Sequence, residues 1–107
     1  QDPIAQANKG GFDFKRNFLY FTMMINTGYM HSIFVSATIK RGFCQWAKAN
    51  NLSESGAEVL RRLFVVDGHH HHFHMRMKCS PNYPTCQNQK DLIPKGQTGC
   101  EQLGVKL

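Results

Sequence analysis

The sequence predicts an α+β protein: an antiparallel sheet built from two β-hairpins, with a central helical segment packed on one face and disulfides that stabilise it. Two apolar runs that alternate with period two flank a turn at residues 26–28, and a third alternating run follows Asp67-Gly68. A stretch with helical spacing lies between them. We expect residues 1–107 to form a single small domain.

The first hairpin is predicted at the N-terminal end. Residues 1–15 are polar and contain Gly10-Gly11, which predicts a flexible arm. Residues 17–26 are rich in aromatic side chains and residues 31–40 alternate, so both are expected to be strands.

The register of this hairpin follows from its apolar residues, because a slip by one residue would expose all of them. The residues expected to face the core are Leu19, Phe21, Met23, Ile25, Ile33, Val35, Ala37 and Ile39. The open end of the hairpin would bring Lys15-Arg16 beside Lys40-Arg41.

The central segment has helical spacing. Residues 43–52 place Phe43, Trp46 and Ala47 on one stripe, which predicts a helix. Residues 55–58 read Ser-Gly-Ala-Glu, the form of a capping box, so a second helix is expected to run to about Arg62. A strand then follows through Val66.

A histidine-rich strand is predicted after the Asp67-Gly68 turn. Period two would direct one set of side chains to the core and the other to the surface. The inward set is Phe73, Met75, Met77 and Cys79, and the outward set is His70, His72, His74, Arg76 and Lys78.

Residues 80–107 contain three prolines and many polar residues, which predicts a loop-rich tail tied by disulfides. The four cysteines are Cys44, Cys79, Cys86 and Cys100. Pairing Cys44 with Cys79 and Cys86 with Cys100 is favoured, since Cys44 and Cys79 would both face the core. The alternative pairs Cys79 with Cys86 and Cys44 with Cys100.

The cysteines also indicate a compartment. Two disulfides predict a secreted, extracellular protein, and a chain that begins at Gln1 fits a mature form. No apolar run reaches the ~18 residues of a membrane helix, so we expect no transmembrane segment. We also expect a monomer. Asn51-Leu52-Ser53 is a glycosylation acceptor triplet.

The formal charge of +6 favours anionic partners such as nucleic acid, phosphate or acidic glycans, or else a protein partner. Histidines would add charge as the pH falls, so the surface is also expected to respond to pH. The predicted binding surface comprises His70, His72, His74, Arg76, Lys78, Arg61 and Arg62.

Metal binding is a second possibility for the same strand. Side chains at positions i and i+2 of a strand can converge on one ion, and imidazole suits zinc and copper. His70, His72 and His74 are therefore candidate ligands. With no carboxylate beyond Asp67 nearby, we expect weak zinc or copper binding and no dedicated cofactor.

Catalysis is a third possibility. Glu58, His72 and Arg76 could supply the base, acid and cation that phosphodiester cleavage needs. The order of hairpin, helix and sheet in a small disulfide-bonded chain is similar to that of small fungal ribonucleases and the ribonuclease-like effectors of plant-pathogenic fungi. That resemblance implies action on RNA and assigns no residue here.

The sequence favours a basic, histidine-rich binding protein over an enzyme. We expect a small secreted effector- or toxin-like protein, with a role in virulence. The alternatives are a ribonuclease-like protein or a zinc- or copper-binding protein.

Overall fold

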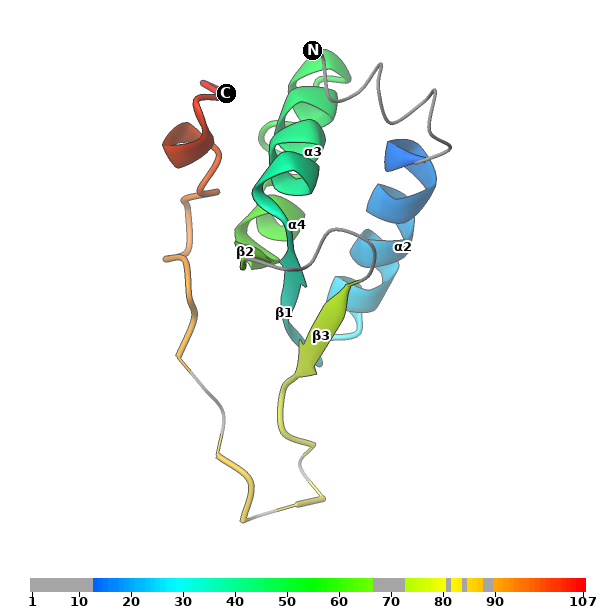
Figure 1. Ribbon diagram of the computed structural model, residues 1–107. Coiled ribbons are helices and arrows are strands. Elements are labelled where there is room, and N and C mark those ends of the chain that lie inside the picture. Colours follow the sequence, from blue (N-terminus) through cyan, green and yellow to red (C-terminus); the bar gives the residue numbers. More distant parts are fainter. Residues whose placement is uncertain (1–12, 67–72, 81, 84, 88–89) are drawn as a thin grey trace.

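The computed structural model describes residues 13–66, 73–80, 82–83, 85–87 and 90–107 (Figure 1). These residues form an α+β fold in which helices pack on a mixed sheet. The elements are α2 (Phe14–Asn26), β1 (Met30–Val35), α3 (Ala37–Ala49), α4 (Ala57–Arg62), β2 (Leu63–Val65), β3 (His74–Met77) and the 3₁₀ helix η1 (Glu101–Leu103).

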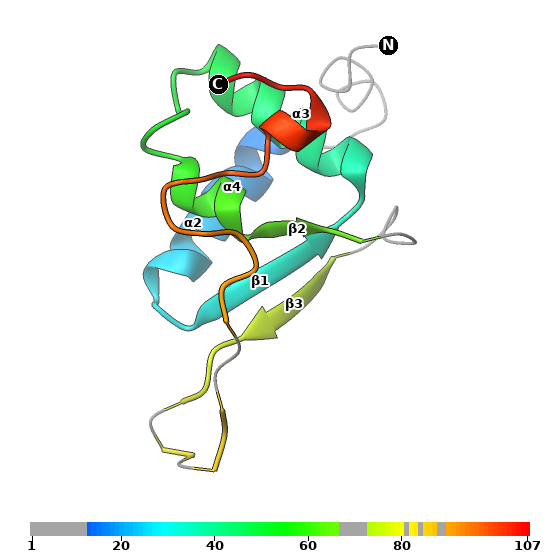
Figure 2. The same ribbon diagram turned by 90° about the vertical axis from the view of Figure 1, so that its left-hand side faces the viewer.

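The sheet has the order β2-β1-β3, with β1 in the centre (Figure 2). β1 pairs with β2 in parallel, with Ile33 opposite Leu63, and with β3 in antiparallel, with Phe34 opposite His74. The predicted antiparallel sheet of two hairpins is therefore wrong. Parallel neighbours need a long crossover, and α3 and α4 supply it between β1 and β2.

The first predicted strand is the helix α2. Asp13 caps it by accepting a hydrogen bond from the backbone N of Arg16 at 2.9 Å. Phe14, Phe18 and Phe21 follow helical spacing and are buried. A run this rich in apolar residues fits both the alternation of a strand and the spacing of a helix. In the helix, the three phenylalanines lie on one buried face.

The second predicted strand is divided between β1 and α3. Ser36 ends the strand and caps the helix, because its Oγ accepts a hydrogen bond from the backbone N of Ile39 at 3.2 Å. α3 therefore begins six residues earlier than the helix predicted at residues 43–52, and it ends at Ala49. Its buried face holds Phe43, Cys44 and Ala47.

The helix predicted to end near Arg62 and the strand predicted after it are present as α4 and β2. The predicted capping box is absent from α4. Gly56 is the N-cap and makes no side-chain capping bond, while Glu58 pairs with arginines.

Aromatic rings fill the core between α2 and α3. Phe14 meets Phe43 edge-on at 5.0 Å between centroids, and Phe21 lies 5.6 Å from the same ring. Gly42 permits this approach, since a Cβ there would lie 2.3 Å from Cζ of Phe14. Leu19 and Met23, expected inside, are 54% and 70% exposed.

β3 is shorter and more exposed than predicted. The prediction that Met75 and Met77 face the core is wrong, since they are 39% and 55% exposed. Phe73 is partly buried and packs edge-on against Phe21 at 5.3 Å. The residues of the predicted Asp67-Gly68 turn lie outside the described part of the chain.

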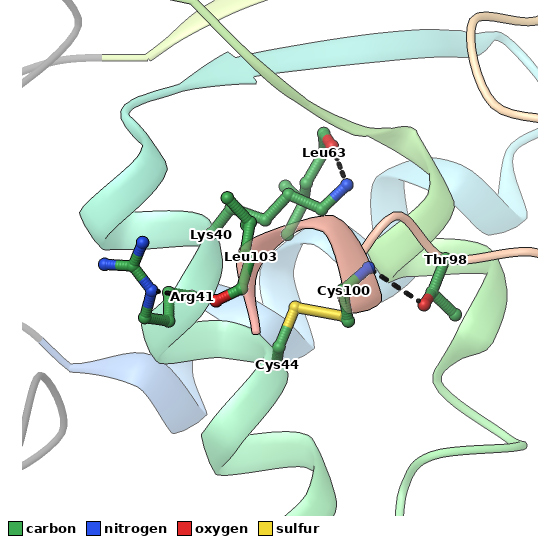
Figure 3. Close-up of a disulfide and its surroundings, with 7 residues drawn as sticks. All are labelled: Lys40, Arg41, Cys44, Leu63, Thr98, Cys100 and Leu103. Atoms are coloured by element: carbon green, nitrogen blue, oxygen red, sulfur yellow. Dashed lines mark hydrogen bonds between the residues drawn. A yellow bond between two sulfur atoms is a disulfide. The ribbon is translucent and has the colours of Figure 1, made fainter. Parts of the chain in front are cut away.

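The disulfides follow the alternative pairing. Cys44 of α3 bonds Cys100, which holds η1 against α3 (Figure 3). Cys79 bonds Cys86 within the loop after β3. The favoured Cys44–Cys79 pairing is wrong, because β3 lies at the sheet edge beyond β1 and Cys44 lies at the end of the core covered by η1. None of the described helices is long and apolar enough to cross a membrane.

Candidate functional site

The described part of the histidine strand forms one edge of the sheet. In the pairing with β1, His74 lies opposite Phe34 and Arg76 opposite Ser32. Directly opposed residues share a face of a sheet, so His74 and Arg76 lie on the face that carries Phe34. Both are exposed.

Two aromatic rings support Arg76. Its guanidinium lies 5.4 Å from the centroid of Phe34, and Phe34 meets Phe64 of β2 edge-on at 5.9 Å. A cation over an aromatic face is favourable by about 0.5–1 kcal/mol at exposed sites. The contact orders the guanidinium at the surface.

An open, shallow pocket of about 660 Å³ covers this region, and we call it the β3 pocket. It is lined by Phe34, Phe73, His74, Met75, Arg76 and Met77. An imidazole and a guanidinium thus share one concave surface with apolar side chains, a combination that can bind a polar chain and transfer a proton.

The rest of the predicted binding surface is divided. His70 and His72 lie outside the described residues, so metal binding by His70, His72 and His74 stays a prediction. Lys78 follows β3 and is partly buried, and its backbone N donates to the carbonyl of Tyr29 at 2.5 Å.

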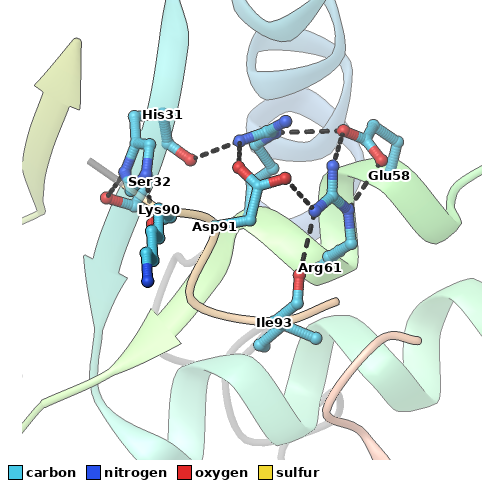
Figure 4. Close-up of polar contacts among 8 residues, drawn as sticks. His31, Ser32, Glu58, Arg61, Lys90, Asp91 and Ile93 are labelled. Carbon is cyan, nitrogen blue, oxygen red and sulfur yellow. Dashed lines mark hydrogen bonds and ion pairs between the residues drawn. The ribbon is translucent and has the colours of Figure 1, made fainter. Parts of the chain in front are cut away.

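Arg61 and Arg62 belong to a separate cluster with Glu58 and Asp91, which we call the arginine cluster (Figure 4). Their side chains are only 5% and 7% exposed. Arg61 donates to both oxygens of Glu58, at 2.8 and 2.6 Å, and to Asp91 at 2.9 Å.

The cluster holds its acids ionised. Hydrogen bonds from Arg61 are the main cause of a lowered pKa at Glu58 and at Asp91. The same carboxylates raise the pKa of Arg61. These ionised groups satisfy one another, so the cluster is suited to structure more than to proton transfer.

The predicted catalytic set is not assembled. Glu58 bonds to Arg61 and Arg62, which lie on its own helix α4, whereas Arg76 lies over Phe34 on the sheet. His72 lies outside the described residues.

Sequence reasoning missed His31 and Asp91. The ring of His31 is buried, with Nδ1 2.9 Å from Oγ of Ser32 and Nε2 2.9 Å from the carbonyl of Lys90. Arg62 donates to the backbone carbonyl of His31 at 2.9 Å. Apart from the adjacent Ser32, these partners are 59 and 31 residues away in the chain, so no local pattern in the sequence indicates them.

Lys40 was also misplaced by the sequence prediction. It is predicted to lie beside Lys15 and Arg16 at the open end of a hairpin, but the segment is the helix α3, and Lys40 is buried on its inner face. Burial lowers its pKa to about 8.

A family model described as penicillin-insensitive murein endopeptidase matches residues 15–105. The matched range includes α2 from its second residue on, the other helices, the three strands, both disulfides, the β3 pocket and the arginine cluster. No curated protein matches the chain.

The match overturns the functional expectation. A non-enzymatic, effector- or toxin-like binding protein is wrong, and the ribonuclease-like alternative falls with it, because the matched family is a murein endopeptidase. The two disulfides fit a location outside the cytoplasm. By a match that covers most of its length, this chain belongs to the penicillin-insensitive murein endopeptidase family.

Proposed function

We propose that this chain hydrolyses peptide bonds in murein, and that the β3 pocket is where the substrate binds. The observation that carries the proposal is the family match, because it extends across every described element that builds the pocket. The pocket is open, as the processing of a cross-linked polymer requires, since a polymer cannot enter an enclosed cavity.

The side chains of the pocket suit amide hydrolysis. That reaction needs a group to take a proton from water and a positive group near the developing oxyanion. The imidazole of His74 is the kind of group that can accept or donate a proton in such a reaction, and Arg76 presents N–H donors in the same pocket. The apolar lining of Phe34 and Phe73 can hold the aliphatic parts of a murein peptide.

A zinc ion is proposed as the cofactor of this site. His70, His72 and His74 have the period-two spacing of ligands on a strand, and the structure places His74 at the start of β3 with its side chain exposed. A bound zinc ion would act as a Lewis acid for the amide. Arg76 would then orient the substrate.

The finer location is also a proposal. An enzyme acting on murein must reach the cell wall, so we place the chain in the periplasm or at the outer surface. Both are compatible with the two disulfides.

The test is digestion of purified murein, with released peptides identified by liquid chromatography and mass spectrometry. The wild-type chain is expected to release peptides cut at an amide bond, at a rate that benzylpenicillin leaves unchanged. His74→Ala should lower the rate of peptide release by at least about tenfold. Lys95→Ala, at an exposed position outside the pocket, should keep the wild-type rate. Wild-type protein that releases no peptide from murein would refute the function.

The cofactor is tested separately by elemental analysis after dialysis. We expect about one zinc ion per chain, and loss of that ion in the His72→Ala and His74→Ala variants. Murein cleavage by a metal-free protein would remove the zinc proposal and leave the peptidase proposal standing.

A further inference from the structure

A second cavity, of about 300 Å³, lies between β2 and the C-terminal tail. It is lined by apolar side chains from both segments, among them Phe64, Val65, Leu92, Ile93 and Leu103. Its volume is at the lower end of the range for small-molecule sites. None of the residues that line this cavity also lines the β3 pocket.

Lys40 brings a positive charge to this cavity. It lines the cavity from α3 and is only 2% exposed. Its Nζ donates one hydrogen bond, to the carbonyl of Leu63 at 2.6 Å (Figure 3). An ammonium has three donors, so two N–H groups remain without an acceptor among the described residues.

The tail fits closely around the ammonium. A Cβ at Gly99 would lie 2.6 Å from Nζ and 2.9 Å from Cδ1 of Ile93. Gly99 also has a φ of +80°, which favours glycine. The backbone of the tail therefore passes directly beside the charge, and a side chain at this position would cover it.

No carboxylate from the described part of the chain lines the cavity beside Lys40. Among the described residues that line the cavity, Lys40 is the one that titrates, and the flanking charged residues Arg41 and Glu101 are not part of the lining. Arg41 instead donates from Nε to the carbonyl of Leu103 at 3.1 Å. A buried cation without a counterion is costly, and its lowered pKa of about 8 reflects that cost.

The geometry points to a binding site for a small aliphatic monocarboxylate, whose carboxylate pairs with Nζ of Lys40 and whose alkyl chain lies against Leu92, Ile93 and Leu103. One ammonium neutralises one carboxylate, whereas a phosphate dianion would bring a second buried charge with no partner. Gln97 and Gln102 line the cavity and are exposed, so their amides can move aside to admit the ligand and donate to its second oxygen.

Hexanoate and its neutral analogue hexanamide are suitable probes for isothermal titration calorimetry. We expect one hexanoate per wild-type chain, bound at least about tenfold more tightly than hexanamide. A tenfold ratio is the size of effect that a charge-assisted hydrogen bond produces. Lys40→Met keeps an unbranched apolar side chain and should abolish the preference. Lys48→Met, the same substitution at an exposed position of the same helix, should preserve it.

The wild-type protein gives an independent test. As the pH rises from about 7 to about 9, Lys40 loses its proton, and hexanoate affinity should fall roughly tenfold while hexanamide affinity stays constant. Equal affinity for the two probes, a pH-independent hexanoate affinity, or no binding of hexanoate would each overturn the proposal. This site does not depend on the proposed murein activity.

Discussion

Arg61 and Asp91 form an ion pair that joins the core to the C-terminal tail, with Nη1 of Arg61 2.9 Å from Oδ2 of Asp91. The two residues are 30 apart in the chain. Arg61 also donates to the carbonyl of Ile93 at 2.9 Å. One buried guanidinium thus fixes the path of the tail over α4 and helps to shape the cavity beside Lys40.

Asp91→Asn should weaken this connection. The variant keeps the shape of the side chain but leaves Arg61 with Glu58 as its one carboxylate partner, and Asp91 is half-exposed, so solvent limits the loss. We expect the free energy of unfolding to fall by about 1 kcal/mol in urea titrations. Glu101→Gln, at an exposed position of the tail, is the matched control and should change little. An Asp91→Asn protein as stable as the control would contradict the structural role of the pair.

Acid should destabilise the protein through the same cluster. The pKa values of Glu58 and Asp91 are lower in the folded protein than their ordinary values of 4.5 and 3.8. Their contribution to stability is therefore complete above those values, and it is lost as the pH falls through the lowered, folded-state values. Urea titrations across this range should show a smaller decrease for Asp91→Asn than for wild type. Parallel curves would show that Asp91 does not carry the effect.

Lys40 should give a dependence of the same sign at alkaline pH. Its folded pKa is about 8 and its ordinary value is 10.5, so between them the unfolded chain binds more protons. Stability should then rise with pH over this interval, by at most about 1.4 kcal/mol per pH unit from this group. The difference in unfolding free energy between wild type and Lys40→Met isolates the rise from other groups. A difference that does not change with pH would mean that Lys40 is solvated in the folded protein.

The sequence located the later elements better than the first ones. The change from helix to strand near Arg62 was predicted because Leu60, Arg62 and Phe64 leave the helical period there. The strand predicted at residues 17–26 is wrong because nearly every position there is apolar or aromatic, so alternation and helical spacing fit the sequence equally well. Asp13, a local helix-capping signal, would have decided for the helix.

The sheet order could not be predicted locally. Once α2 is a helix, β1 has no N-terminal neighbour to pair with, and its partners come from β2 and β3. Of the residues predicted to form a binding surface over His70–Lys78, His74 and Arg76 are exposed in the structure, and their role in binding stays a prediction. Arg61 and Arg62 are not part of that surface, because they bind Asp91 and the carbonyl of His31 in the arginine cluster. These partners are about 30 residues away in the chain, so a local pattern could not indicate them.

The two disulfides should contribute unequally. Cys44 and Cys100 are separated by 56 residues and are fully buried, whereas Cys79 and Cys86 are separated by seven. Loop-closure entropy predicts losses of about 4 and about 2.5 kcal/mol for the paired alanine variants. Urea titration of each double variant measures these values. The same loss in both variants would contradict the dependence on loop length.

Arg76→Gln tests the β3 pocket, and it rests on the proposed murein activity. The substitution removes the charge and the contact with Phe34, which lies at the surface, so the free energy of unfolding should change by less than about 1 kcal/mol. If Arg76 orients the substrate or supports the oxyanion, the rate of murein cleavage should fall by about tenfold or more. Arg16→Gln, at an exposed arginine of α2 that pairs weakly with Asp13 at 3.9 Å, is the matched control and should cleave murein at the wild-type rate. If Arg76→Gln is active and His74→Ala is inactive, Arg76 has no role in cleavage and the role of His74 stands. If both variants are fully active, the substrate does not bind at β3.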